Sequence, residues 1–198
     1  MIKLSIITKH DITLRSSCEK YDVELVPLTD EHLPLLYKWN SDPEVLYYAD
    51  SDIVESYSQE TVNSIYSNVS KNAFCFLIKA NGIPIGDCWL QKMNIKKVLE
   101  KYPAGTDVRR IDMCIGEKAY WGKGIGTIFV KMLVDFAFTR QSTDVLHCFV
   151  ESYNPRSARV FEKNGFTIIK SEKNPEGSKG EFELHLRLTK EEYKKGKC

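Results

Sequence analysis

The sequence has no apolar run long enough to cross a membrane. A membrane-spanning helix needs about 18 or more consecutive apolar residues, and no segment approaches that length. The apolar start of the chain is interrupted by Lys9, His10 and Asp11, too soon for the apolar stretch of a signal peptide. We therefore expect a cytoplasmic protein with no membrane partner.

An excess of one charge is also missing. The chain has 28 Lys and Arg residues against 27 Asp and Glu, for a formal net charge of +1. A domain that binds nucleic acid usually has a clear basic excess, so we expect no nucleic-acid partner. The 198 residues, 42% of them hydrophobic, suffice for one well-buried domain. We predict a single domain over residues 1–198, with an N-terminal extension over 1–20 and a frayed tail over 190–198.

Cysteine and histidine do not occur at metal-ligand spacings. The four histidines form no paired spacing of the kind that binds zinc. Cys75 and Cys148 lie inside short apolar runs, where buried free thiols of a reducing compartment are the expected state. The remaining cysteines are Cys18, Cys88, Cys114 and Cys198. We expect no metal site.

Apolar periodicity and turn residues divide the chain into strands and helices without internal repeats. Strands are predicted over 23–28, 73–80, 83–93, 108–115, 146–150, 166–170 and 183–188. Helices are predicted after a cap at Thr29, from near Ser58, and over 125–139 and 155–164. Residues 2–15 are predicted as a hairpin or extra strand, 41–52 as a loop rich in acids and aromatics, and 94–107 as a polar excursion. This order predicts a mixed α/β sheet.

A glycine-rich turn, Gly122-Lys123-Gly124-Ile125-Gly126-Thr127, lies between a strand-like run and an amphipathic run. Glycines let the backbone approach a ligand, and unpaired N–H groups at a helix start attract anions. The spacing fits neither a P-loop nor the dinucleotide-binding fingerprint. A flexible turn without a ligand is the alternative. We interpret the turn as a site for a phosphate-bearing ligand.

A second segment, from Asn154 to Phe166, contains Glu162-Lys163-Asn164-Gly165-Phe166. The two motifs, in this order and separation, resemble the GNAT superfamily of acyl-CoA-dependent N-acyltransferases over roughly residues 22–188. Within that superfamily, the segment from Ile111 to Thr127 is most similar to aminoglycoside 6′-N-acetyltransferases. The run Ile83-Pro84-Ile85-Gly86 and Trp39 are similar to that group too.

The resemblance implies a fold and a cofactor. The expected fold is a mixed, mostly antiparallel sheet, splayed between strands 4 and 5 (108–115 and 146–150) and flanked by helices. The expected co-substrate is acetyl-CoA, with its pantetheine arm on the backbone of strand 4, its pyrophosphate on the glycine-rich turn, and Asn154 near the thioester. Trp121 departs from the Arg or Gln usual in the family. The residues predicted to bind the cofactor are Cys114, Ile115, Trp121, Gly122, Lys123, Gly124, Ile125, Gly126, Thr127 and Asn154.

Asp112 is the predicted catalytic residue. It lies in an apolar strand beside the expected thioester, and a carboxylate there can accept the proton of an attacking amine. A structural Asp at the end of a strand is the alternative, and either interpretation requires a partner for the charge. Many family members place a Tyr at the position of Phe161 to protonate the thiolate. Here Tyr153, water, or unassisted departure of the thiolate are the options left open.

The acceptor is predicted to be a small cationic amine, most similar to an aminoglycoside, which would make the protein an antibiotic-resistance enzyme, monomeric or homodimeric. Acidic and aromatic residues suit amines and sugar rings, although the loop over 41–52 could be an ordinary solvated loop. The alternatives are another amine (a siderophore precursor, a polyamine or a protein N-terminus) or a catalytically idle acyl-CoA-binding module. The predicted substrate-binding residues are Tyr48, Asp50, Trp89, Gln91 and Glu151.

Overall fold

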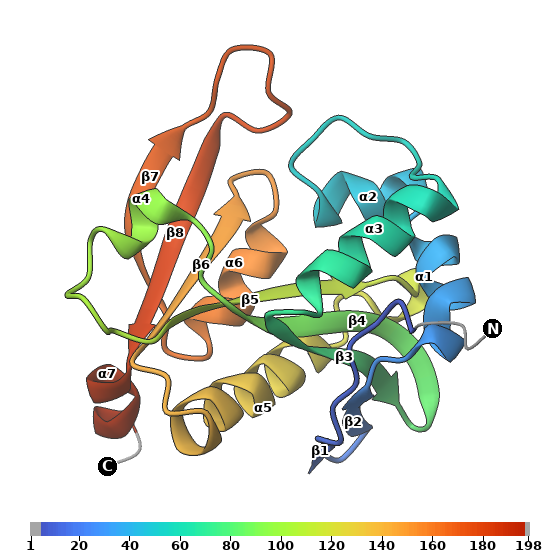
Figure 1. The fold of residues 1–198 in the computed structure, drawn as a ribbon, viewed down its shortest axis with the longest axis horizontal. Helices are drawn as coiled ribbons and strands as arrows, with labels where there is room; N and C mark the ends of the chain where they lie inside the picture. The colour runs from blue at the N-terminus through green and yellow to red at the C-terminus, as the bar shows by residue number, and fades with distance from the viewer. Residues whose placement is uncertain (1–4, 197–198) are drawn as a thin grey trace. The chain divides into compact units, whose positions relative to one another are not determined.

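The computed structural model describes residues 5–196, and Figure 1 shows its elements. The strands are β1 (Leu14–Ser17), β2 (Asp22–Pro27), β3 (Ala73–Ala80), β4 (Ile83–Lys92), β5 (Val108–Ile115), β6 (Val145–Glu151), β7 (Thr167–Lys173) and β8 (Phe182–Thr189). The α-helices are α1 (Leu33–Trp39), α2 (Pro43–Ala49), α3 (Gln59–Val69), α4 (Lys96–Leu99), α5 (Ile125–Arg140), α6 (Pro155–Glu162) and α7 (Lys190–Lys195). Two 3₁₀ turns, η1 (Asp30–His32) and η2 (Lys118–Tyr120), precede α1 and α5.

The strands follow the order β1-β2-β3-β4-β5-β6-β8-β7 in one sheet. Pairing is antiparallel between β1 and β2, β2 and β3, β6 and β8, and β7 and β8. The exception is β5 and β6, which run parallel and pair only at their start, through Val108 with Val145 and Arg109 with Leu146. The predicted mixed, mostly antiparallel sheet is therefore confirmed, and the short pairing of β5 with β6 agrees with the expected splay.

The chain divides into two compact units. The first contains residues 1–89 and 113–125, and the second contains residues 90–112 and 126–198. The core of the first unit joins α1, α2 and α3 to β3 through fully buried side chains such as Leu36, Val62 and Leu77. A smaller core in the second unit holds Val98 of α4 against Val108 and Val145 of the parallel pair.

Local sequence signals explain most element boundaries. Asn81 and Gly82 both have positive φ, as the predicted type I′ turn between β3 and β4 requires. The side chain of Ser58 accepts from the Thr61 N–H and starts α3 where the sequence indicates. Helix α6 ends two residues earlier than predicted, and Gly165 follows it with φ +88°.

Two predictions about irregular segments are wrong. Residues 43–49 form helix α2 rather than part of a loop, because Asp42 accepts from two N–H groups of the first turn and Pro43 stands at its first position. The tail is not frayed over 190–195, where a capping box between Thr189 and Glu192 starts α7. The hairpin or extra strand predicted over 2–15 is misplaced, because residues 5–13 form no strand and β1 covers Leu14–Ser17. Residues 1–4 and 197–198 lie outside the described part.

None of the helices in residues 5–196 combines the length and apolar character needed to span a bilayer. Over the same residues, His, Cys, Asp and Glu side chains do not gather in groups of three that could hold a metal ion.

Candidate active site

The glycine-rich turn has the geometry that its sequence predicts. Gly122 and Gly124 have φ values of +70° and +81°, which other residues adopt only with strain, and helix α5 starts directly afterwards at Ile125. A Cβ on either glycine would meet no atom within 4 Å, so both are needed for backbone conformation rather than for space. Gly126 serves packing instead, because its Cβ would lie 3.2 Å from a methyl group of Val160 on α6.

Trp121 connects this turn to β5 and to α2. Its indole N–H donates to the carbonyl of Ile115 over 2.6 Å. The ring of Tyr48 packs edge-on against the Trp121 ring, with centroids 5.5 Å apart. Tyr48, predicted to bind the acceptor, is thus in direct contact with Trp121, predicted to bind the cofactor. The carbonyl of Ile115, whose backbone was predicted to pair with the cofactor, already accepts a hydrogen bond from Trp121.

The acidic residues around α2 are largely engaged within the first unit. Lys118 of η2 makes salt bridges of 2.9 Å to Asp42 and 3.0 Å to Glu44, and its hydrogen bond is the main cause that lowers the pKa of Asp42. Asp50 accepts from the hydroxyl of Tyr57 over 2.8 Å. Burial, followed by this bond to Asp50, raises the pKa of Tyr57 to about 12. The acidic side chains of residues 42–50 therefore stabilise this segment through their contacts and also give it negative charge.

The end of β5 approaches β4 very closely. A Cβ on Gly86 would lie 2.1 Å from the carbonyl oxygen of Cys114, so only glycine fits at this position. After β5, the N–H of Glu117 donates to the carbonyl of Ile85 over 3.0 Å. The carboxylate of Glu117 accepts from the Trp39 indole over 2.9 Å and pairs with Lys38. These contacts position the backbone of Cys114 and Ile115.

Asp112 has a cationic partner, as a carboxylate in an apolar strand requires. The guanidinium of Arg110, two residues earlier on the same side of β5, binds both carboxylate oxygens, one of them over 2.7 Å. Burial opposes the charge on Arg110, but the bond to Asp112 raises the pKa of Arg110 overall. Arg110 also lies over the ring of Phe149 on β6, 5.5 Å from its centroid. About a quarter of each paired side chain stays exposed.

Two further predicted residues lie at the end of β6. Glu151 is its last residue and accepts from the amide of Asn174 over 2.8 Å. Asn154 caps α6, where its side chain accepts from the N–H of Ser157 over 3.2 Å. Both side chains thus have local structural roles beside any role in binding.

The predicted residues on β4 are partly enclosed. Trp89 is half-buried and packs edge-on against Tyr66 of α3, with centroids 5.9 Å apart. Gln91 is only 7% exposed and shares one side of the strand with Trp89 by alternation. Phe161 is buried against Phe166 in the second unit, with centroids 5.1 Å apart, and has no proton to give to a thiolate.

A known domain matches most of the chain. The model of the acetyltransferase (GNAT) domain matches residues 22–167. The chain belongs to this family. It is therefore an N-acetyltransferase, and its eight-stranded sheet with flanking helices is a GNAT fold.

Relatives of known activity share this GNAT domain at low identity. An aminoglycoside N(6′)-acetyltransferase type 1 of Klebsiella pneumoniae is 24% identical over 184 residues, covering 86% of this chain and 85% of that protein; one of Serratia marcescens matches equally. A crystal structure of an aminoglycoside acetyltransferase with coenzyme A and kanamycin has a TM-score of 0.72 at 21% identity, covering 89% of this chain and 99% of that chain. Spermidine N-acetyltransferase of Vibrio cholerae, with CoA and spermine, has a TM-score of 0.70 at 15% identity, covering 86% and 97%.

Several partners of the site residues in this GNAT chain were not predicted from the sequence. Arg110 could have been found, because a cation two residues from Asp112 lies on the same side of a strand. Lys118 and Asp87 gave no such signal, since their partners come from distant segments. The Nζ of Lys179 lies over the ring of Tyr153, 5.1 Å from its centroid. The sequence did not predict this contact, because the two residues are far apart along the chain.

Proposed function

We propose that the protein transfers the acetyl group of acetyl-CoA to a primary amine, and that this amine is the 6′-amine of an aminoglycoside. The observation that carries the proposal is the combination of the GNAT domain with relatives named as 6′-acetyltransferases along most of the chain. An enzyme with this activity would give antibiotic resistance. The acetyl-CoA pyrophosphate would lie on the amides of Gly122 to Thr127, at the start of α5.

Direct attack of the neutral amine on the thioester carbonyl fits the residues present. As the N–C bond forms, the nitrogen acquires positive charge and becomes a strong acid, so that even a weakly basic carboxylate can take its proton. Asp112 is the proposed acceptor of this proton, and its fixed pairing with Arg110 would hold one orientation. The C–S bond then breaks, and the departing thiolate gains a proton from Tyr153 or water, since a thiol has a pKa near 8.5.

The mechanism predicts that Asp112→Asn reduces kcat by about 10²-fold to 10⁴-fold, the usual contribution of a general base. The affinity for acetyl-CoA, measured by calorimetry, should change by less than about twofold, because the proposed cofactor contacts are backbone groups. A kcat equal to that of the wild type would contradict the role of Asp112.

The chain provides a matched control for this variant. Asp107, directly before β5, forms the same kind of two-bond pair with Arg109, at 2.8 and 3.0 Å. Asp107→Asn removes an ion pair whose arginine is more buried, with 8% of the Arg109 side chain exposed against 23% of Arg110, so it should cost at least as much stability and leave kcat unchanged. Equal losses of activity in both variants would assign a structural role to both carboxylates.

A polyamine is the second candidate acceptor, favoured by the fold shared with a spermidine acetyltransferase. Thiol release from acetyl-CoA with kanamycin and with spermidine distinguishes the two. We expect the higher kcat/KM with kanamycin. A preference for spermidine would transfer the proposal to polyamines, and firm acetyl-CoA binding without turnover on either would favour an idle module.

A further inference from the structure

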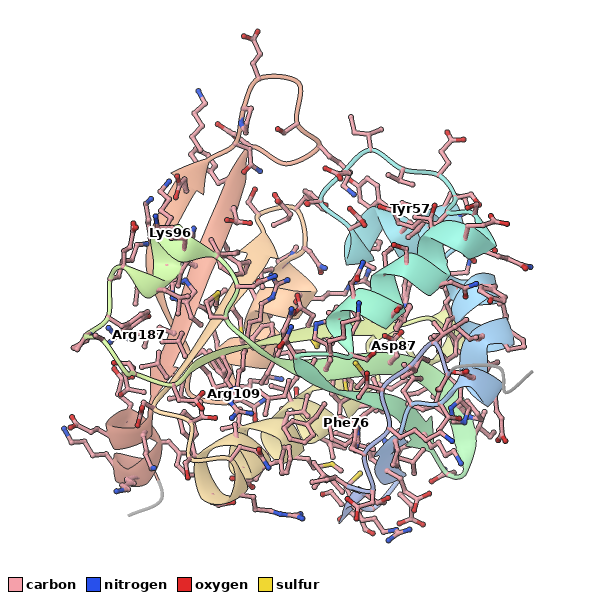
Figure 2. All side chains as sticks on the ribbon, in the orientation of Figure 1. Tyr57, Phe76, Asp87, Lys96, Arg109 and Arg187 are labelled. Carbon is pink, nitrogen blue, oxygen red and sulfur yellow. The ribbon has the colours of Figure 1, made fainter. Side chains whose placement is uncertain are left out.

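Asp87 on β4 is a buried carboxylate that the proposed reaction does not use (Figure 2). It is 1% exposed, and the hydroxyl of Tyr66 on α3 donates to its Oδ2 over 2.8 Å. Its other oxygen, Oδ1, is buried without a hydrogen-bond partner in residues 5–196. A buried polar atom left without a partner costs free energy, so such a group is retained only where something compensates for it.

Within residues 5–196, the groups that influence Asp87 include no cation. They are the Tyr66 hydroxyl from α3 and the thiols of Cys75, Cys88 and Cys114 from β3, β4 and β5. The side chain of Asn40 bonds Tyr66 in turn. Burial raises the pKa of Asp87 to about 7, against the smaller opposite effect of the Tyr66 hydroxyl. The charge of Asp87 therefore changes near neutral pH.

Asp87 is linked through Tyr66 to the aromatic ring of Trp89. Trp89 is two residues from Asp87 and on the same side of β4. Tyr66 connects them, because its hydroxyl bonds Asp87 while its ring packs edge-on against Trp89. Trp89 is half-buried, so the residue reaches the surface of the protein. Aromatic rings attract cations, and a negative charge in an apolar interior is weakly screened.

We propose that Asp87 is a specificity-determining residue that, when ionised, draws a non-reacting ammonium group of a polycationic acceptor onto Trp89. The inference rests on the cationic acceptor of the proposed function and adds where a second positive charge of that acceptor binds. Cation binding favours the ionised carboxylate. Protonated Asp87 therefore releases its proton to the solvent when the acceptor binds near pH 7.

The test is the KM for kanamycin as a function of pH. In the wild type we expect KM to fall about tenfold from pH 6 to pH 8, the effect of a unit charge about 10 Å away at an effective dielectric constant of about 20. Asp87→Asn should lack this contribution, so that the ratio of the variant KM to the wild-type KM should rise from about 1 at pH 6 to about 10 at pH 8. Dividing the KM of the variant by the KM of the wild type at each pH removes the effect of the ionisation of kanamycin itself. In Asp87→Asn, kcat and the affinity for acetyl-CoA should be unchanged.

Tyr66→Phe is the second variant. This variant keeps the carboxylate but removes the hydrogen bond that lowers the pKa of Asp87, so the fall in KM should move to higher pH. If Asp87→Asn does not fold, Tyr66→Phe still tests the proposal. Exposed Asp22 at the start of β2 supplies the control Asp22→Asn, which should follow the wild type. A merely structural role for Asp87 would change stability without moving the pH profile.

A measurement without turnover separates this inference from the proposed function. Calorimetry of kanamycin binding at pH 7, in two buffers of different ionisation enthalpy, should show more proton release in the wild type than in Asp87→Asn, and the difference between the two is the proton of Asp87. Acetylation of kanamycin with the same pH profile in both proteins would overturn the inference and leave the proposed function standing. Binding without acetylation, but with this difference in proton release, would refute the function alone, and equal proton release in the two proteins would overturn the inference.

Discussion

At the scale of single residues, what decides a carboxylate's role is its partner. Asp112 was predicted as the catalytic residue, and its need for a partner followed from its apolar strand. Arg110 meets that need within two residues. Asp87 gave no signal, because the sequence does not show that Tyr66, 21 residues earlier, is the group that donates to it. Its environment depends on packing between elements, which periodicity does not specify.

Buried titratable groups in the two units should affect stability in opposite directions. Asp87 has a raised pKa in the fold, so its stabilising contribution is complete below pH 4 and is lost as the pH rises to 7, by up to about 4 kcal/mol. Burial, with smaller effects of nearby cations, lowers the pKa of His147 to about 4. Its contribution is complete above pH 6.5 and is lost as the pH falls to 4, by up to about 3 kcal/mol.

We therefore predict opposite changes in the pH dependence of unfolding. From pH 4 to 7, Asp87→Asn should gain stability relative to the wild type, and His147→Gln should lose it. Urea unfolding at four pH values measures both differences. Parallel curves for all three proteins would show that neither group titrates differently in the folded state.

At the scale of elements, the sequence predicted those with a strong local signal. β5 was predicted to the residue, and the start of α5 after the glycine-rich turn is also as predicted. Helix α2 was missed because its acidic and aromatic residues suggest a loop, while the Asp42 cap and Pro43 that start it are equally common in turns. The contact of Tyr48 with Trp121 depends on this helix.

Gly124→Ala tests the glycine-rich turn as an element. Placing Ala at φ +81° costs about 1 kcal/mol or more, or shifts the amides of the turn. We expect the dissociation constant for acetyl-CoA, measured by calorimetry, to rise about tenfold. Gly105→Ala is the control, because Gly105 has φ +86° and equally open surroundings but lies before β5. If both variants bound acetyl-CoA alike, the turn would not be the pyrophosphate site.

At the scale of the whole molecule, the order of elements and the pair of motifs were enough to predict the fold and the family. The match to the GNAT domain over residues 22–167 confirms that prediction. The acceptor could not be derived with the same certainty, because GNAT chains share the cofactor motifs whereas acceptor residues depend on side chains from several segments. Tyr48, Asp50, Trp89, Gln91 and Glu151 stay predictions for that reason.

The central claim is that the protein acetylates the 6′-amine of an aminoglycoside. Thiol release from acetyl-CoA should be measured with two aminoglycosides that differ only in carrying an amine or a hydroxyl at position 6′, and the product should be mapped by NMR. We predict turnover with the amine, loss of at least about 10²-fold in kcat/KM with the hydroxyl, and acetyl on the 6′ nitrogen. Equal turnover of both compounds, or acetyl on another nitrogen, would contradict the account.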